Sequence, residues 1–180
     1  MLRAVSEPRN IFLVGPMGSG KSAVGKRLAT LLGRSFYDSD AEIERRTGVD
    51  IPYIFEKEGE AGFRLRESEA LDALTQLSGI VLATGGGAIL APENRRWLAS
   101  RGTTIYLETS VEQQVRRVGA GRQRPLLKDV DPQERLTELM HVRAPLYAEI
   151  AHFTVRTDQR RVEAVVEEIL RQTGLTSQPS

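Results

Sequence analysis

The sequence predicts a single α/β domain in which helices cover both faces of a parallel sheet. First, short apolar runs alternate with segments of helical periodicity along nearly the whole chain, which is the pattern of strands buried between layers of helices. Second, a glycine-rich loop directly follows the first apolar run, as in many α/β sheets that bind ligands. Third, 180 residues are enough for one domain with a substantial hydrophobic core.

Five apolar runs predict the strands of this sheet. Each run is short enough for a strand that is buried on both faces. The predicted strands cover residues 11–14, 35–37, 80–83, 104–107 and 153–156. In open α/β sheets, ligands gather beyond the carboxyl ends of the strands. The residues that follow each run are therefore the candidates for a binding site.

Capping patterns and apolar spacing mark the helices between these runs. A first helix is expected over residues 23–32, and a last one over about 161–172. Ser110 and Asp131 are each followed three residues later by Gln or Glu, which is the capping-box pattern of a helix start. Pro145 is expected to interrupt the helix that begins at Asp131.

The glycine-rich loop carries the most specific chemistry in the sequence. Residues 15–22 read Gly-Pro-Met-Gly-Ser-Gly-Lys-Ser, a complete GxxxxGK[ST] pattern between a predicted strand and a predicted helix. Glycines let backbone N–H groups close around phosphate oxygens, and the helix N-terminus adds partial positive charge. Lys21 would reach the β- and γ-phosphates of a nucleoside triphosphate, and the Ser22 hydroxyl would ligate Mg²⁺. The candidate nucleotide-binding residues are Gly18, Ser19, Gly20, Lys21, Ser22 and Ala23.

Two carboxylates, Asp38 and Asp40, follow the second predicted strand at the edge of the sheet where the phosphate loop lies. One could hold a water on Mg²⁺, and the other could accept a proton from, or align, an attacking hydroxyl. Since no carboxylate closes the third predicted strand, Asp38 is the best candidate for the metal. The alternative for Asp40 is that it caps the helix that follows.

A glycine triplet and two arginines are candidates for binding a second substrate. Gly86 is the centre of the triplet after the third predicted strand, where missing side chains permit close approach to a small ligand or simply a flexible turn. Arg64 and Glu67 are three residues apart on one predicted helix, so they share a face and could be a surface ion pair. Arg64 and Arg143, arriving from different helices, would form a bidentate clamp for a carboxylate.

A basic stretch from Gly119 to Pro125 lies between two predicted helices and contains Arg122 and Arg124. Its glycines could let it close over a triphosphate, which would exclude water and bring cationic side chains to the charge that shifts during transfer. The alternatives are a solvated loop or a nucleic-acid-binding patch. The second is disfavoured because no aromatic side chains are interleaved for base stacking.

The composition excludes several classes of function. The formal net charge is +1 with 27% charged residues, which disfavours a general nucleic-acid binder or a polybasic membrane anchor. The sequence has no cysteine, which excludes disulfides, thiolate metal sites and a cysteine nucleophile. No apolar segment is long enough to span a bilayer, and the start does not resemble a signal peptide. We therefore expect a cytoplasmic protein without nucleic-acid or membrane partners, with a monomer as the default state.

Taken in order, these motifs resemble the shikimate kinase family. The resemblance runs from about residue 10 to 170 and rests on GPMGSGKS, FYDSDAEIE, IFEKEGEAGFRLRE, LATGGG, RPLL and RAPLY. It implies a P-loop NTPase fold of the nucleoside monophosphate kinase type, with a five-stranded parallel sheet flanked by helices. It also implies transfer of the γ-phosphoryl group of ATP, with Mg²⁺, to the 3-hydroxyl of shikimate, a step of aromatic amino-acid biosynthesis.

The resemblance divides one kinase domain into parts. The core would cover about 10–172, with an acceptor-binding part at about 38–67 and a mobile lid at about 119–131. Residues 1–9 and 175–180 carry no periodic apolar pattern and are expected to be loose ends.

The resemblance also implies a role for each candidate residue. The implied catalytic residues are Lys21, Asp40 and Arg124. The implied shikimate-binding residues are Asp40, Phe63, Arg64, Glu67, Gly86 and Arg143. Beyond the loop, the implied nucleotide-binding residues are Arg117, against adenine, and Arg124, on the transferred phosphate, while Ser22 and, through water, Asp38 would hold the metal. One departure is that residues 157–160 lack a proline that packs on adenine in some relatives.

Two other functions fit part of this pattern. A related kinase for gluconate or a nucleoside monophosphate would use the same loop, and paired arginines also suit a phosphate acceptor. The other alternative is a regulatory module that binds a nucleotide without turning it over. The sequence has no Asn-Lys-x-Asp guanine-reading motif, and the basic lid would have no evident purpose in such a module. The full set of motifs favours shikimate.

Overall fold

The structure is a computed structural model that describes residues 9–119 and 124–178. Within these residues, five parallel strands form one sheet in the order β2-β3-β1-β4-β5. The strands are β1 (Asn10–Val14), β2 (Ser35–Asp38), β3 (Ile80–Ala83), β4 (Gly102–Glu108) and β5 (Phe153–Arg156). The predicted strands are therefore confirmed, although β4 begins earlier than predicted.

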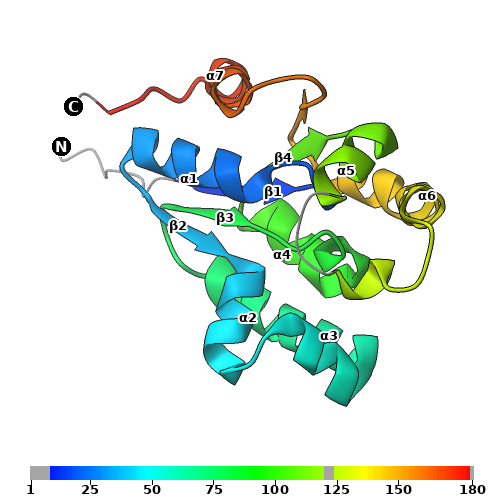
Figure 1. Cartoon of the computed structure of the whole chain (residues 1–180). Coiled ribbons are helices and arrows are strands. Elements are labelled where there is room, and N and C mark those ends of the chain that lie inside the picture. Colours follow the sequence, from blue (N-terminus) through cyan, green and yellow to red (C-terminus); the bar gives the residue numbers. More distant parts are fainter. Residues whose placement is uncertain (1–8, 120–123, 179–180) are drawn as a thin grey trace.

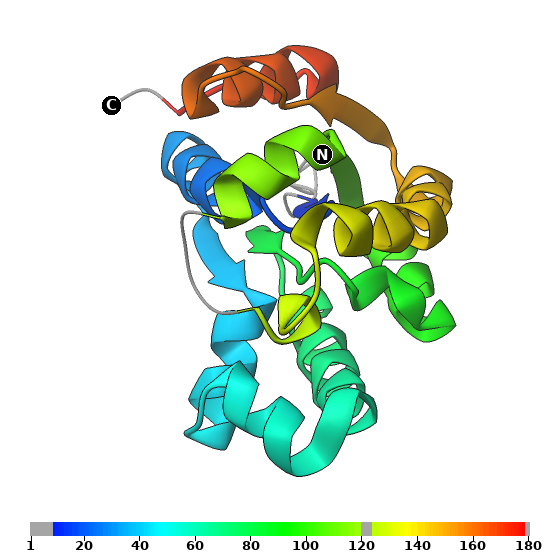
Figure 2. The same ribbon diagram turned by 45° about the vertical axis from the view of Figure 1, so that its right-hand side comes forward.

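Helices cover both faces of this sheet (Figure 1, Figure 2). One face carries α1 (Lys21–Leu32) and α7 (Val162–Thr173). The other carries the second half of α3 (Ile51–Thr75), α4 (Pro92–Ser100) and α6 (Pro132–Ile150). The remaining elements are α2 (Ser39–Thr47), α5 (Val111–Val118) and two short 3₁₀ turns, η1 (Ala88–Leu90) and η2 (Pro125–Leu127). In Figure 1, α2 and the first half of α3 extend below the sheet on the side of β2.

The hydrophobic core consists of one apolar cluster on each face of the sheet. On β1, Ile11 and Leu13 join the cluster with α1 and α7, whereas Phe12 and Val14 join the cluster with α3, α4 and α6. Burial on both faces explains why β1 and β3 read as continuous apolar runs, whereas the edge strands β2 and β5 are only partly buried. A third, smaller cluster joins α2 to α3.

The predicted interruption at Pro145 is wrong, because α6 continues through it to Ile150. A proline inside a helix removes one backbone hydrogen bond and crowds the carbonyl one turn earlier. Here Pro145 and His141, which carries that carbonyl, are both exposed, so water can satisfy the freed oxygen. Arg143 and Tyr147 are buried on the other side of the helix, and their packing stabilises it.

The predicted helix starts at Ser110 and Asp131 are confirmed, since both side chains accept hydrogen bonds from the first turn of the helix that follows. Of the predicted loose ends, residues 1–8 and 179–180 lie outside the described residues. Leu175 packs against the core, and the Gln178 N–H donates to the Leu31 oxygen at 2.9 Å.

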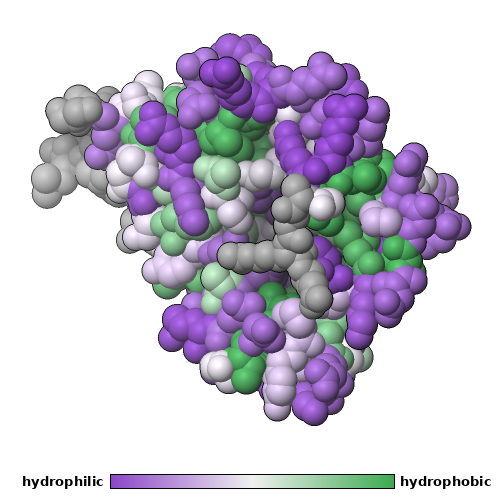
Figure 3. Space-filling view, viewed as in Figure 1, coloured by the Kyte–Doolittle hydropathy of each residue, from purple (hydrophilic) through white to green (hydrophobic). Residues whose placement is uncertain are grey.

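The outer surface is largely hydrophilic on the face viewed in Figure 3, with a hydrophobic area where α5 and α6 meet. None of the helices in the described part of the chain combines the length and the apolar character that crossing a membrane requires.

Candidate active site

The phosphate loop lies at the carboxyl end of β1, between the strand and the first turn of α1. Gly20, the residue before α1, has a φ angle of 86°, and Gly15 has one of 150°, both of which favour glycine. A Cβ on Gly15 would lie 2.7 Å from the backbone oxygen of Leu107. The loop therefore packs directly against the end of β4 and leaves no room there for a side chain.

Lys21 is buried, and its ammonium group bridges the two ends of the loop. Its Nζ donates to the backbone oxygens of Gly15 and Pro16, both at 2.8 Å, and to Ser19 Oγ at 3.2 Å. Burial lowers the pKa of Lys21 to about 8, and the negative charge of Asp40 opposes this effect. Phosphate oxygens are the usual partners of the lysine in this motif. The backbone oxygens of the loop hold the Lys21 ammonium close to where a triphosphate would bind.

Asp38 makes two different contacts at the start of α2. Its Oδ1 accepts hydrogen bonds from the N–H groups of Asp40 and Ala41 at 2.9 and 3.3 Å, and its Oδ2 accepts one from the Ser22 hydroxyl at 2.6 Å. The alternative prediction that Asp40 caps this helix is therefore wrong. The helix begins at Ser39, so Asp38 is the capping residue and the Asp40 side chain is left for the site.

Ser22 and Asp38 form a donor set that fits Mg²⁺. Mg²⁺ prefers oxygen ligands, and at phosphate sites it usually takes few protein ligands in addition to water and phosphate oxygens. A hydroxyl and a carboxylate oxygen 2.6 Å apart could supply the protein's share of such a site. No group of three or more His, Cys, Asp or Glu side chains able to hold a metal ion is found within residues 9–119 and 124–178.

Asp40 has the properties of an acid–base group. Its Oδ1 is buried and has no hydrogen-bond partner among the described residues. Burial, together with the charges of Asp38 and Glu67, raises the pKa of Asp40 to about 7 against the opposing charge of Lys21. A carboxyl group that titrates near neutral pH is suited to accept a proton from an alcohol.

The glycine triplet at the end of β3 faces the charged groups of the site at close range. A Cβ on Gly85 would lie 2.9 Å from Asp40 Oδ1 and 2.9 Å from Glu67 Oε2. A Cβ on Gly87 would lie 2.6 Å from Arg64 Cζ. Asp40 lies on α2, and Arg64 and Glu67 lie on α3, so distant parts of the chain meet at the triplet.

Arg64 and Glu67 form an ion pair in which Glu67 is buried and Arg64 is partly buried, so the alternative of a surface pair is wrong. Arg64 Nη1 donates to Glu67 Oε1 at 2.8 Å, and the Glu67 side chain is 1% exposed. Burial raises the pKa of Glu67, while the Arg64 charge opposes this effect. The Arg64 guanidinium also lies 5.2 Å from the centre of the Phe63 ring, which in turn packs against Phe55. The guanidinium is therefore fixed on two sides.

Arg143 reaches the same triplet from α6. Its side chain is buried, and a Cβ on Gly86 would lie 3.5 Å from its Nη1. Burial lowers the pKa of Arg143, and Tyr147, one turn later on the helix, opposes this effect. The Tyr147 hydroxyl donates to the Gly86 oxygen at 2.5 Å. The structure thus brings Arg64 and Arg143 together from two helices, as the sequence predicts.

The remaining two predicted arginines lie on the nucleotide side. Arg117 Nη1 donates to the Gly18 oxygen at 2.7 Å, and its Nη2 donates to the Thr157 oxygen at 3.3 Å. Arg117 therefore connects the phosphate loop to the segment after β5. Arg124 is exposed at the start of η2. Its charge adds to the lowering of the Lys21 pKa by burial and opposes the raising of the Asp40 pKa by burial. Residues 120–123 of the predicted lid lie outside the described residues.

The family model described as "Shikimate kinase" matches residues 17–173 of this chain. The chain belongs to the shikimate kinase family. A shikimate kinase of Methylococcus capsulatus is 56% identical over 162 residues, which cover 90% of this chain and 90% of that protein. The structure of a shikimate kinase from Acinetobacter baumannii in complex with shikimate has 51% sequence identity and a TM-score of 0.90, covering 92% of this chain and 93% of that chain.

A gluconokinase structure from Sinorhizobium meliloti is similar in fold alone, with 18% identity and a TM-score of 0.60 over 93% of this chain and 92% of that chain. The family and the fold class predicted from the sequence are therefore confirmed. The alternatives of a gluconate or nucleoside monophosphate kinase, or of a regulatory module, are not favoured.

Two residues that bond the glycine triplet are not among the candidates predicted from the sequence. Ser39 is fully buried, and its Oγ accepts a hydrogen bond from the Gly85 N–H at 2.9 Å. Tyr147 binds the next residue of the triplet through its hydroxyl. Their place in the sequence is the available signal, since Ser39 lies between Asp38 and Asp40 and Tyr147 lies one helical turn after Arg143.

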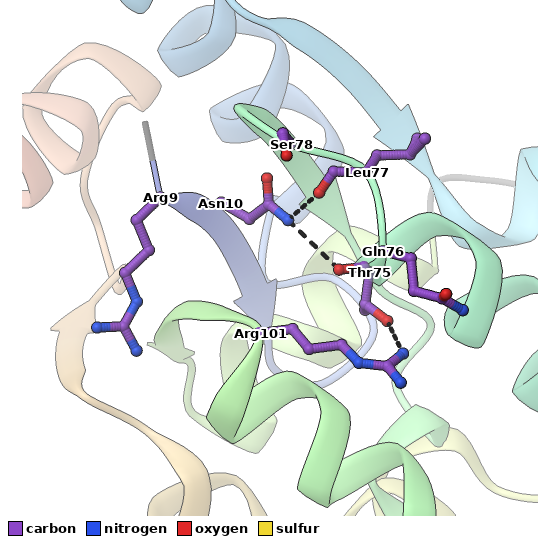
Figure 4. Close-up of a pocket in the computed structure, with 7 residues that line it drawn as sticks. All are labelled: Arg9, Asn10, Thr75, Gln76, Leu77, Ser78 and Arg101. Atoms are coloured by element: carbon purple, nitrogen blue, oxygen red, sulfur yellow. Dashed lines mark hydrogen bonds between the residues drawn. The ribbon is translucent and has the colours of Figure 1, made fainter. Parts of the chain in front are cut away.

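A pocket of about 430 Å³ lies at the opposite end of the sheet (Figure 4). Asn10, the first residue of β1, lines it and donates to the Leu77 oxygen at 2.5 Å. Arg101 also lines it and is already bonded to Thr75 Oγ1 and to Asp72. Because ligands of open α/β sheets bind at the carboxyl ends of the strands, this pocket is not where a substrate is expected.

Proposed function

We propose that this chain transfers the γ-phosphoryl group of ATP to the 3-hydroxyl of shikimate, giving shikimate 3-phosphate and ADP. The observation that carries the proposal is the convergence of two carboxylates and two guanidinium groups on one glycine triplet beside a phosphate loop. Shikimate has one carboxylate and several hydroxyls. Such a substrate needs cationic groups for its carboxylate and an acidic partner for the reacting hydroxyl.

The nucleotide would bind along the loop from Gly18 to Ala23, with its phosphates at the N-terminus of α1. The Lys21 ammonium would exchange its carbonyl partners for β- and γ-phosphate oxygens, and Arg117 would lie against adenine. Mg²⁺, held by Ser22 and through water by Asp38, supplies neutralisation of phosphate charge when bound.

Shikimate would bind between α6 and the acceptor-binding part, which we place at about 38–67 and which includes the first half of α3. Arg64 and Arg143 would hold its carboxylate, with Glu67 keeping Arg64 in position and Phe63 lining the pocket. Asp40 would accept the proton of the 3-hydroxyl or align this group for attack. Its unpartnered Oδ1 and its pKa of about 7 support either role.

The segment at about 119–131 would act as a lid over the bound substrates. Arg124 would meet the transferred phosphate, since its charge already reaches Lys21 and Asp40 in the structure. Closure of such a lid excludes water and adds a positive charge where negative charge shifts during transfer.

We also propose that the chain acts as a monomer, because the proposed reaction assigns no role to a second copy of the chain. The reaction transfers a phosphoryl group from one small molecule to another, so it requires neither a nucleic-acid nor a membrane partner.

A coupled assay of ADP release tests the proposed reaction, with shikimate, gluconate and nucleoside monophosphates offered separately. Shikimate should stimulate ADP release and the others should not, and ³¹P–¹H coupling in the product should place the phosphate on the 3-hydroxyl. Asp40→Asn should lower kcat by about 10²–10⁴ and change the Kd for ATP little. Stimulation by none of these acceptors would instead support a regulatory module.

A further inference from the structure

The Arg64 guanidinium binds a second carboxylate besides Glu67. Arg64 Nη2 donates to Glu60 Oε1 at 3.3 Å, and the Glu60 side chain is 49% exposed. The charge of Glu60 also reaches the other groups of the clamp. It opposes the lowering of the Arg143 pKa by burial and adds to the raising of the Glu67 pKa by burial. Glu60 therefore lies near both arginines that would hold a carboxylate of the acceptor.

The contact between Glu60 and Arg64 leaves one edge of the guanidinium incompletely bonded. A carboxylate binds arginine most strongly when its two oxygens meet two parallel N–H groups. In this chain Glu58 binds the Nε and Nη2 groups of Arg66 in that way, at 2.7 and 2.6 Å. On Arg64, Glu60 contacts Nη2 alone, while Nε is buried and has no hydrogen-bond partner among the described residues. The same edge could accept a better placed carboxylate.

A break in α3 determines where Glu60 lies. Gly59 has a φ angle of 71° and a ψ angle of −177°, which interrupts the helical backbone. Glu60 thus begins the second helical part, one turn before Arg64, where a negative charge is favourable. Since the side chain is half exposed and held by one long hydrogen bond, it can turn into solvent at little cost.

We infer that Glu60 occupies the carboxylate position of the clamp in the empty enzyme, and that the carboxylate of the acceptor displaces it from Arg64. Glu60 then lowers the affinity for the acceptor by competing with it, and it keeps the two arginines partly neutralised between turnovers. The inference rests on the proposed function, because it takes Arg64 as a ligand of the acceptor's carboxylate.

Titration calorimetry of shikimate with the full chain, without nucleotide, tests this competition. Glu60→Gln removes the charge and Glu60→Ala removes the side chain, and each should lower the Kd for shikimate by about two- to fivefold, as expected for a half-exposed ion pair. Glu56→Gln is the matched control, because it removes the same charge from an exposed position on α3 that pairs with Lys57. The control should leave the Kd unchanged. An unchanged or higher Kd in both Glu60 variants would overturn the inference.

A neutral analogue separates competition from a general change of the pocket. Shikimate with a carboxamide in place of its carboxylate should gain less affinity from Glu60→Gln than shikimate does, because the neutral amide is not repelled by the Glu60 charge. An equal gain for the analogue and for shikimate would also overturn the inference.

Arg64→Ala distinguishes a failure of the competition by Glu60 from a failure of the arginine clamp itself. Weakened binding of shikimate to Arg64→Ala, with no effect of the Glu60 variants, rejects the competition and leaves the clamp in place. Unchanged binding to Arg64→Ala rejects the clamp, and the role of Glu60 with it.

Discussion

The Ser39 hydroxyl accepts a hydrogen bond from the Gly85 N–H at 2.9 Å, across 46 positions of the sequence. Ser39 is the first residue of α2, and the capping residue of that helix, Asp38, accepts a hydrogen bond from Ser22 in the first turn of α1. One short segment is therefore bonded to the nucleotide side of the site through Asp38 and to the acceptor side through Ser39. We therefore expect the relative placement of the two substrates to depend on these bonds.

Replacing Ser39 with alanine should lower kcat/KM for shikimate. The change leaves a partly buried N–H group unpaired, which costs up to about 1–3 kcal/mol, so a reduction of about tenfold is expected. The KM for ATP should change less, because the phosphate loop keeps its own contacts. Steady-state kinetics measure both values. Ser39→Thr keeps the hydroxyl and should restore activity, whereas wild-type kinetics in Ser39→Ala would show that this bond does not position the substrate.

The pH dependence of kcat/KM should follow Asp40 and Lys21. The pKa of Asp40 is raised to about 7 and that of Lys21 is lowered to about 8. Catalysis requires the ionised carboxylate and the protonated amine, so kcat/KM should rise through the first value and fall through the second. A pH profile of the wild type and of Asp40→Asn checks this. If kcat/KM of Asp40→Asn still rises with pH over the same range, the rise belongs to another group.

The raised pKa of Asp40 also predicts a penalty in stability. The unperturbed value is 3.8 and the value in the folded protein is about 7, so between these values the folded state binds more protons than the unfolded chain. Stability therefore falls as pH rises across this window. Asp40→Asn removes the ionisation and should raise Tm relative to the wild type at pH 8, with a much smaller gain at pH 5. Thermal scans at both pH values test this, and a gain that does not depend on pH would contradict it.

Loss of either clamp arginine should raise the KM for shikimate. Charge-assisted hydrogen bonds are worth about 1.5–3 kcal/mol each, so Arg64→Ala and Arg143→Ala should each raise this KM by about ten- to a hundredfold. The KM for ATP should stay close to that of the wild type. Arg45→Ala is a suitable control, because Arg45 is an exposed residue of α2 that pairs with Glu42. Unchanged KM values for shikimate in both clamp variants would remove these arginines from the acceptor site.

Turnover should require Mg²⁺ and should depend on Ser22. Removal of divalent cations with EDTA should abolish ADP release, and added Mg²⁺ should restore it. Ser22→Ala lacks the hydroxyl that contacts Asp38 at 2.6 Å, so it should need more Mg²⁺ for half-maximal rate. Ser100→Ala, at an exposed helix end, serves as the control. A normal requirement for Mg²⁺ in Ser22→Ala would exclude this hydroxyl as a ligand.

The strands could be predicted because burial on both faces forces a continuous apolar run, as in residues 11–14 and 80–83. Their spatial order could not, since β3 lies between β2 and β1 and local patterns carry no information on strand pairing. The rule that proline interrupts a helix failed at Pro145 because buried neighbours on the other side of α6 stabilise the helix.

The candidate residues could be predicted where they occupy motifs at strand ends, as do Lys21, Asp38 and Gly86. Ser39 and Tyr147 could not, because a hydroxyl that bonds the backbone leaves no periodic or spaced pattern in the sequence. Their partners lie 46 and 61 positions away. Such contacts become visible when the fold brings the triplet to α2 and α6.

The glycine triplet gives the acceptor site a wall made of backbone. A methyl group at Gly85 would meet two carboxylates, one at Gly86 would approach the Arg143 guanidinium, and one at Gly87 would meet that of Arg64. The charged groups can lie this close to the backbone because three successive residues have no side chain. A side chain at Gly85 or Gly87 would displace a charged group, so this wall cannot be reshaped at these two positions without changing the electrostatics of the site as well.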